Sequence, residues 1–413
     1  MSQRTETVVI GAGSAGLSCS HHLTQRQHEH LVFEQGRIAE SWRTGRWDGF
    51  RLNTPSYFLN LPGLPYDGDD PEGFLTGAET VAHLERYSAS SDAPVRAGVR
   101  VLELARRAGR FALQTSAGGI EAENVVVATG AFQRPAPRPA GANPPPRILQ
   151  LHANEYRRPD QLPPGAVLVV GSGQSGCQIA NELNADGRAV YLSLGRCPSV
   201  PLYYRGRQFA RWAIDLGLME DTVDSLPTRD SRLLCNPVVG HAGGGHLCDP
   251  QRLAREGVVL IGRIHRLDGS IAHVIADASE RLAEAARFAT AFKRRVDAFV
   301  AAGGLDVPEE PDGEDAPTAA SDMRELDLTA ADVGAIVWAN GYRPDFGWLQ
   351  MPVFDEAGWP LQQRGVTAVP GLYFVGLPWL HKRKSALLLG VGEDAGHVAS
   401  TIVGDSLPAR RTE

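Results

Sequence analysis

The sequence predicts an α/β fold built from two Rossmann-like dinucleotide-binding units. A short apolar run leads directly into a G-x-G-x-x-G motif at Gly11–Gly16, and the same arrangement recurs at Gly171–Gly176. Further apolar runs end in glycine, at Val125–Gly130 and Ala335–Gly341. Runs of this kind are typical of strands buried on both faces of a parallel sheet.

The first unit begins with the strand Val8–Ile10. The three glycines of the motif after it allow a tight turn, a close approach of backbone to a pyrophosphate, and packing of the next helix on the strand. That helix directs its free N–H groups toward phosphates. A second strand, His30–Phe33, ends in Glu34, 18 residues after Gly16, where a carboxylate can hold an adenosine ribose. The order predicts a dinucleotide site; a glycine turn without a ligand is the alternative.

The chain between the two motifs is expected to continue the first unit. The aromatic-rich stretch after Glu34 forms either core beneath a long loop or a wall of a cofactor pocket. The pattern predicts a helix over Phe74–Ser88 and strands over Val99–Leu104 and Phe111–Thr115. Arg134–Pro146 contains six prolines and is therefore expected to be an extended linker.

The second unit repeats the first, but a base replaces the acid. Strand Ala166–Val170 precedes the second motif, and the next strand, Ala189–Leu194, is followed by Arg196. A guanidinium pairs with a ribose 2′-phosphate that a carboxylate would repel. The pattern favours NADPH over NADH, with Arg205 and Arg207 as supporting charges. A solvated surface arginine is the alternative for Arg196.

The rest of the chain is expected to complete both units. A strand is predicted at Gly257–Ile261, and a long helix from Ser279 carries an apolar stripe that packs on its own domain or forms a homodimer seam. A strand at Leu372–Val375 and a closing helix near Gly392–Val403 follow. The basic run His381–Lys384 is interpreted as a solvated loop.

Two loops remain without an assigned role. Cys235–Asp249 brings cysteines and histidines together, but their spacing matches no standard zinc pattern, so no metal is expected. Asp306–Asp322 is acidic and contains prolines, which is typical of a surface loop or a lid.

Composition excludes several classes of protein. The net charge of −7 and the lack of a basic stripe argue against a nucleic-acid partner. No apolar run approaches the roughly 20 residues of a membrane span, and the first strand begins too early for a secretory signal. Five cysteines without a C-x-x-C pair suit a reduced, cytoplasmic protein that has no redox-active disulfide.

These motifs together resemble the class B, NADPH-dependent FAD monooxygenases, which include flavin-containing monooxygenases, YUCCA-type enzymes and Baeyer–Villiger monooxygenases. The resemblance rests on both glycine motifs, on A-T-G at Ala128–Gly130 and on A-N-G-Y at Ala339–Tyr342, and it spans Val8 to Val403. A bacterial branch of FAD-dependent oxidoreductases carries similar Y-R-G-R, R-P-D-F-G and L-Y-F-V-G-L-P-W-L-H segments. The resemblance implies that FAD binds at the first glycine motif and NADPH at the second. The NADPH domain, 161–330, would be inserted in an FAD domain of 1–160 and 331–413.

The family fingerprint F-x-G-x-x-x-H-x-x-x-W/Y falls on Pro146, Ile148, His152 and Tyr156, of which the last two match. A tyrosine at the last fingerprint position, as in Tyr156, is more similar to heteroatom oxygenases than to Baeyer–Villiger enzymes. Because the Phe and Gly of the fingerprint are missing, the subclass stays open.

The resemblance also gives the expected site. Asn53 falls where flavin-containing monooxygenases place an asparagine beside the flavin, and its amide can orient a peroxide without titrating; a turn asparagine ahead of Pro55 is the alternative. Asn53 is therefore the expected catalytic residue. The expected cofactor-binding residues are Gly11, Gly13, Ser14, Ala15, Gly16, Glu34, Gln35, Trp42, Arg43, Thr54, Val101, Ala128, Thr129, Gly130, Gly171, Gly173, Gln174, Ser175, Gly176, Ser193, Arg196, Arg205, Asn340 and Gly341.

The expected reaction uses reduced FAD and O2 to form a C4a-hydroperoxide, which oxygenates a small nitrogen or sulfur nucleophile. An NADPH-dependent flavin oxidase or reductase, a Baeyer–Villiger monooxygenase and a non-catalytic dinucleotide sensor remain alternatives.

Overall fold

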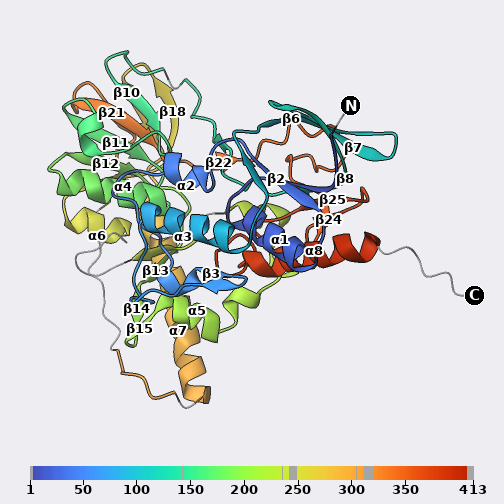
Figure 1. Cartoon of the computed structure of the whole chain (residues 1–413). Helices are drawn as coiled ribbons and strands as arrows, with labels where there is room; N and C mark the ends of the chain where they lie inside the picture. Colours follow the sequence, from blue (N-terminus) through green and yellow to red (C-terminus); the bar gives the residue numbers. More distant parts are fainter. Residues whose placement is uncertain are drawn as a thin grey trace, which may run out of the picture.

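The computed structural model describes residues 3–141, 143–234, 236–240, 249–303, 305–310 and 320–406. Helices and strands of these residues are arranged around two main sheets, which Figure 1 shows side by side, the second at the upper left. The architecture is a mixed α/β fold, as the sequence predicts.

The first sheet draws its strands from both ends of the chain. In the described residues it has nine strands, with β1 between β2 and β8. Near the C-terminus, β25 pairs with β8 in parallel, with Leu372 opposite Val125. The strands are β1 (Gln3–Ile10), β2 (His30–Glu34), β5 (Val95–Ala97), β6 (Val101–Arg107), β7 (Arg110–Thr115), β8 (Gly118–Val127), β23 (Gln362–Gln363), β24 (Val366–Thr367) and β25 (Leu372–Phe374).

Both faces of this sheet are covered. Helices α1 (Ser14–Gln25), α3 (Gly77–Ser90) and α8 (Val391–Ser406) share one apolar core with it, while the β6–β7 hairpin and residues 346–359 pack on the other face. Helix α3 begins later than expected because Thr76 caps it: the Thr76 hydroxyl accepts from the Glu79 N–H, and Glu79 accepts from the Thr76 N–H in return.

The second sheet is parallel throughout. Its order is β10 (Leu149–His152), β21 (Val333–Trp338), β11 (Ala166–Val170), β12 (Val190–Ser193) and β17 (Val259–Ile261). Side chains of α4 (Gln174–Ala185) and α6 (Pro250–Arg255) share the core on one face. Strands β18 (Ile264–Asp268), β19 (Ile271–Val274) and β20 (Glu325–Asp327) share the core on the other.

A smaller part lies below both sheets in Figure 1 and packs on the first unit. Its core includes Trp212 and Val296, and Phe209 and Met219 contact Phe58 of the first unit. The elements are β13 (Ser199–Pro201), β14 (Tyr203–Tyr204), β15 (Arg207–Gln208), α5 (Phe209–Asp215), the 3₁₀ turns η3 (Leu218–Glu220), η4 (Val223–Ser225) and η5 (Arg229–Leu233), β16 (Val238–Gly240) and α7 (Ala278–Gly303).

Helix α7 is the long helix that the apolar stripe predicts. Leu282 packs in the core of the second sheet, and Phe292 and Val296 pack in the smaller core. The stripe is thus used within the chain, so it no longer calls for a homodimer seam.

The expected domain limits of 160/161 and 330/331 differ from the strand pairing. Strands β10 and β21 lie outside 161–330, yet both belong to the second sheet. The proline-rich linker contains β9 (Arg134–Pro135), which pairs antiparallel with β22 (Tyr342–Arg343).

No helix of the described residues is long and apolar enough to cross a membrane.

Candidate functional site

The first glycine loop has the close backbone contacts that a phosphate cradle needs. Gly11 has φ +110°, and a Cβ added to it would lie 2.6 Å from the carbonyl oxygen of Ala128. A Cβ on Gly16 would lie 1.9 Å from the carbonyl oxygen of Gly11, whereas a Cβ on Gly13 would meet no protein atom within 4 Å. Gly11 and Gly16 are therefore required by the turn, and the open side of Gly13 is where a ligand would approach.

The second glycine loop repeats this geometry. Gly171 also has φ +110°, and its added Cβ would lie 2.5 Å from the carbonyl oxygen of Ala339. A Cβ on Gly176 would lie 1.8 Å from the carbonyl oxygen of Gly171. The A-T-G and A-N-G segments are thus counterparts, because each supplies the alanine that closes one glycine loop.

Helices α1 and α4 begin at these loops with free N-termini. Their N-cap residues, Gly13 and Gly173, provide no side-chain cap, and neither helix has an acidic residue in its first turn. Among the described residues, no side chain caps the first N–H groups of either helix, and no carboxylate of the first turn competes for the positive end of the dipole, so both ends suit an anion. The chain thus fits a dinucleotide pyrophosphate at each loop.

Glu34 lies beside the first loop, as expected. Its side chain is buried, and its two carboxylate oxygens accept from the N–H groups of Ala12 and Gly36, each at 2.9 Å. A carboxylate has about four lone-pair sites, so it can hold the loop and still accept from a ribose diol. The carbonyl of Glu34 accepts from the Val99 N–H, which brings the start of β6, with Val101, close to the same edge.

Other expected FAD-side residues follow in a segment attached to this loop. The Ala39 N–H donates to the Ala12 carbonyl at the start of α2 (Glu40–Thr44), which carries Trp42 and Arg43. Arg43 pairs with Glu85, and its Nε donates to the Ile38 carbonyl. Gln35 is exposed.

At the second loop, the structure separates the expected basic residues. Arg196 is exposed and forms no hydrogen bond or ion pair with other described residues; the Gly195 N–H donates to Ser172 of the loop. Arg205 instead pairs with Asp297 of α7 at 3.2 Å and donates to the Pro308 carbonyl.

Two other residues expected to bind the cofactor form hydrogen bonds within the protein. The buried Ser193 hydroxyl donates to the Gly262 carbonyl and accepts from the Ile264 N–H. Gln174 accepts from the Val239 N–H, and its amide nitrogen is buried without a partner in the described chain. Ser175 is exposed. Gln174 is therefore the one of these three with a buried donor left over for a ligand.

Two crossings, the segments that connect the sheets after A-T-G and after A-N-G, are joined to each other by hydrogen bonds. The Asn340 amide donates to the Pro137 carbonyl at 2.9 Å, and the Ala136 N–H donates to the Gly341 carbonyl. A ring nitrogen of His152 also lies 3.1 Å from the Gly341 oxygen. In the first crossing, the Gln133 amide donates to the hydroxyl of Thr129 and the carbonyl of Gly130. The expected residues of the A-T-G and A-N-G segments therefore lie in one hydrogen-bonded linker pair.

The fingerprint tyrosine has a packing role. Tyr156 is fully buried, and its hydroxyl donates to Glu182 of α4 at 2.7 Å. Burial raises the pKa of Glu182. Trp47, near this pair, lies in the core of the second sheet.

Asn53 lies in a loop fixed from both sides. The Leu52 N–H donates to the Leu75 carbonyl and the Ser56 N–H to the Gly73 carbonyl, each at 2.8 Å. Asn53 and Thr54 are half-buried, and the Asn53 amide forms no hydrogen bond with another described residue. The backbone is thus held while the amide stays available.

The basic run His381–Lys384 is not a solvated loop, so that expectation is wrong. Lys382 and Lys384 each pair with Glu220 of η3 and with Glu393 in the first turn of α8. Arg383 pairs with Asp221 at 3.1 Å. Glu220 and Asp221 lie 162 positions from Lys382 and Arg383, and Glu393 lies 11 positions from Lys382, so the basic run itself could not reveal these partners.

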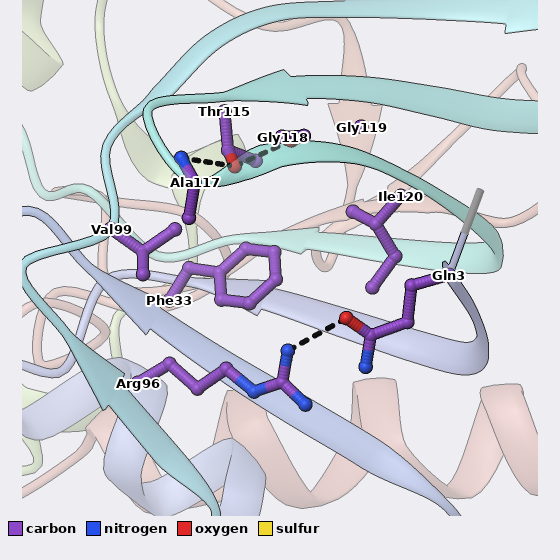
Figure 2. A pocket seen from close by; sticks show the side chains of 9 residues that line it. All are labelled: Gln3, Phe33, Arg96, Val99, Thr115, Ala117, Gly118, Gly119 and Ile120. Carbon is purple, nitrogen blue, oxygen red and sulfur yellow. Dashed lines mark hydrogen bonds between the residues drawn. The ribbon is translucent and has the colours of Figure 1, made fainter. Parts of the chain in front are cut away.

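Two cavities among the described residues contain no residue of either glycine loop. Figure 2 shows one of about 50 Å³, where Arg96 donates to Gln3 at 2.9 Å beside Phe33. It has room for only a few water molecules. A second, of about 180 Å³, lies between Trp47 and Glu182. The described residues contain no cluster of metal-ligating side chains, and 241–248 of the Cys–His loop and 311–319 of the acidic loop lie outside them.

Two cysteines of the described chain are deeply buried. Burial of Cys19 raises the pKa of its thiol to about 12, and Cys177 lies in the core of the second sheet.

Comparison with known proteins agrees with the interpretation of the two glycine loops as dinucleotide sites. A family model described as pyridine nucleotide-disulphide oxidoreductase matches residues 8–198. The chain is 33% identical to a CzcO-like oxidoreductase of Geobacillus kaustophilus, over 98% of this chain and 99% of the relative. It is 31% identical to the rice indole-3-pyruvate monooxygenase YUCCA1, over 44% of this chain and 45% of that protein.

A solved structure shares the fold. The flavin-containing monooxygenase of Stenotrophomonas maltophilia superposes with a TM-score of 0.66 at 18% identity, covering 98% of this chain and all of the other. The length and identity of the CzcO-like match, together with the two dinucleotide loops, establish the family. The chain belongs to the CzcO-like family of oxidoreductases.

Proposed function

We propose that the chain is an NADPH- and O2-dependent FAD monooxygenase that oxygenates a small substrate at nitrogen or sulfur. The observation that carries this proposal is the pair of equivalent glycine loops, closed by Ala128 and Ala339 and followed by uncapped helices. A flavoprotein that takes electrons from a nicotinamide needs one phosphate cradle for each dinucleotide.

Each cofactor is assigned by the charge beside its loop. FAD is proposed at the first loop, with Glu34 toward the ribose, and NADPH at the second, with Arg196, which has no ion-pair partner among the described residues, toward the 2′-phosphate. The two domains of this proposal are centred on the two sheets, with the linker pair between them. When bound and reduced, the flavin supplies oxygen activation, while the chain contributes binding, orientation and exclusion of water.

Oxygenation is favoured over disulfide reduction by the lack of a C-x-x-C pair in the sequence. Disulfide exchange also needs an accessible thiolate. Cys19 and Cys177 are both buried, and burial raises the pKa of Cys19, so neither supplies one. The likeness to named monooxygenases gives further support.

The test is product analysis with isotopic oxygen. Purified protein with FAD, NADPH and ¹⁸O2 is offered a panel of amines, sulfides and ketones, and NADPH use, hydrogen peroxide and ¹⁸O in the product are measured. ¹⁸O in an N-oxide or S-oxide supports the proposal. Peroxide equal to the NADPH consumed indicates an oxidase, ester formation from ketones a Baeyer–Villiger enzyme, and no NADPH use a sensor.

A further inference from the structure

Arg46 is a cation that no carboxylate of the described chain neutralises. Its Nη1 donates to the Gly45 carbonyl at 2.8 Å, and this is its one hydrogen bond with the described residues. The guanidinium carbon lies 5.2 Å from the ring centroid of Trp42 and 5.3 Å from that of Phe50. Since a guanidinium has five N–H donors, most of them remain available.

The side chain also lies deep in the protein. Burial lowers the pKa of Arg46, although a guanidinium stays charged at neutral pH, and solvent still reaches part of the side chain. That combination is expected of a residue facing a recess. Nearby arginines are neutralised: Arg37 pairs with Glu40, and Arg43 pairs with Glu85. Because a desolvated cation without a partner is costly, Arg46 needs another reason to be there.

Arg46 lies where the two units meet. It follows α2, which is attached to the first glycine loop through Ala39. On the other side is Arg157: the Asp48 N–H donates to its carbonyl at 2.9 Å, and its Nη2 donates to the Thr44 carbonyl. Nη1 of Arg157 donates to the carbonyls of Asn154 and Tyr156, so both of its terminal nitrogens are engaged. Arg46, by contrast, donates among the described residues to the Gly45 carbonyl alone.

We propose that Arg46 binds an anionic oxygen group, a phosphate or a carboxylate, at the junction of the two units. A planar guanidinium matches such a group with two parallel hydrogen bonds, and the rings of Trp42 and Phe50 hold it in place. The anion is supplied by the nicotinamide nucleotide or by the substrate. This inference rests on the proposed function in one respect, because that function is the reason for using NADP⁺ as a probe.

The test compares three variants of the flavin-loaded enzyme. Arg46→Met keeps the length and the packing against the rings but removes the charge, and Arg46→Lys keeps the charge. Arg110→Met is the control, because Arg110 lies on β7 and pairs with Glu123 on β8. Each protein is titrated with NADP⁺, phenylacetate and its neutral analogue phenylacetamide, and flavin absorbance and thermal unfolding are recorded.

We expect Arg46→Met to raise the Kd for NADP⁺ or for phenylacetate about tenfold or more, the scale of a lost charge-assisted hydrogen bond. Arg46→Lys should recover part of the loss, and Arg110→Met and all phenylacetamide values should stay within about twofold. Weaker binding of NADP⁺ alone identifies the nucleotide phosphate as the anion, and weaker binding of phenylacetate alone identifies a substrate carboxylate.

Other results would overturn the assignment. If Arg46→Met leaves the NADP⁺ Kd unchanged and wild type binds phenylacetate no better than phenylacetamide, Arg46 only packs against the rings. If wild type binds no NADP⁺, the proposed NADPH site fails, and the phenylacetate titration alone decides the role of Arg46; wild type that binds neither anion refutes it.

Discussion

Gly171 lies directly against Ala339: a Cβ added to Gly171 would be 2.5 Å from the Ala339 carbonyl oxygen. The same relationship holds at 2.6 Å between Gly11 and Ala128. Backbone occupies the space in both cases, so neither loop can yield by moving a flexible side chain.

Gly171→Ala should therefore weaken nucleotide binding while sparing the flavin. The positive φ and the contact with Ala339 both oppose a side chain, and the strain is on the order of 1–3 kcal/mol before the loop shifts. We expect the Kd for NADP⁺ to rise at least about tenfold with normal flavin content, measured by titration and absorbance. Gly11→Ala should show the reverse, loss of flavin.

The control for both is Gly109→Ala. Gly109 has φ +82°, but its added Cβ would meet no atom within 4 Å. This variant carries conformational strain without the clash and should keep both ligands. Equal loss of flavin from Gly11→Ala and Gly171→Ala would contradict the assignment of separate loops.

Arg196→Ala should raise the KM for NADPH about tenfold and leave that for NADH nearly unchanged. Arg196 has no ion-pair partner among the described residues, so its charge is available for a 2′-phosphate, and such a contact is worth roughly 1–3 kcal/mol. Arg205→Ala is the matched control, because Arg205 already pairs with Asp297. Steady-state kinetics with both nucleotides decides between them; equal effects of Arg196→Ala on NADPH and NADH would assign Arg196 another role.

The sequence predicts those parts of the fold whose cause is local. The glycine motifs and the acid at Glu34 impose short-range geometry, and the structure has both loops and the Glu34 contacts in the expected places. Continuous apolar runs predict β8 and β21 for the same reason. Tertiary pairing is different: β10 joins the second sheet only through β21, whose paired residues lie 186 positions later (335 − 149), so the local sequence does not show that residues before 161 contribute a strand to this sheet.

The site residues that the sequence missed depend on partners distant in the chain. Lys384 reads as one member of a basic run, and only the fold brings Glu220 to it. Arg46 is one of several arginines in its segment; what distinguishes it is that no carboxylate of the described residues pairs with it, which a sequence cannot show. Conversely, Arg205 looked suitable for a phosphate until the fold placed Asp297 beside it.

Lys384→Met should destabilise the contact between η3 and α8. Lys384 is buried and bridges Glu220 and Glu393, while Lys382 remains to pair with both carboxylates. We expect a loss of about 1–2 kcal/mol in the free energy of unfolding at pH 7, measured by urea denaturation. Arg107→Met, which removes an exposed pair with Glu103, should change it by less than about 0.5 kcal/mol.

The same network gives the sign of a pH effect. Hydrogen bonds from Lys382 and Lys384 lower the pKa of Glu220. A lowered pKa in the folded state means that the stabilisation is present above the usual glutamate pKa of about 4.3 and is lost as the pH falls through the lowered folded value. The difference between wild type and Lys384→Met should therefore be constant from pH 8 to pH 5 and narrow below it. A difference that grows on acidification would contradict this ion-pair account.

Asn53→Ala tests the proposed oxygen chemistry separately from electron supply. The loop around Asn53 is fixed by the bonds of Leu52 and Ser56, so truncating a half-buried amide should leave its backbone in place. Flavin reduction by NADPH requires alignment with the nicotinamide rather than this amide, and its rate should stay within about twofold. What the amide can supply is a fixed, non-titrating partner for oxygen atoms. Its loss should lower product per NADPH about tenfold, with the difference appearing as hydrogen peroxide.

Asn60→Ala, at an exposed asparagine of the β3 strand (Asn60–Leu61), is the control. Unchanged coupling in Asn53→Ala would show that Asn53 is a turn residue, whereas slowed flavin reduction would place its amide at the nicotinamide instead.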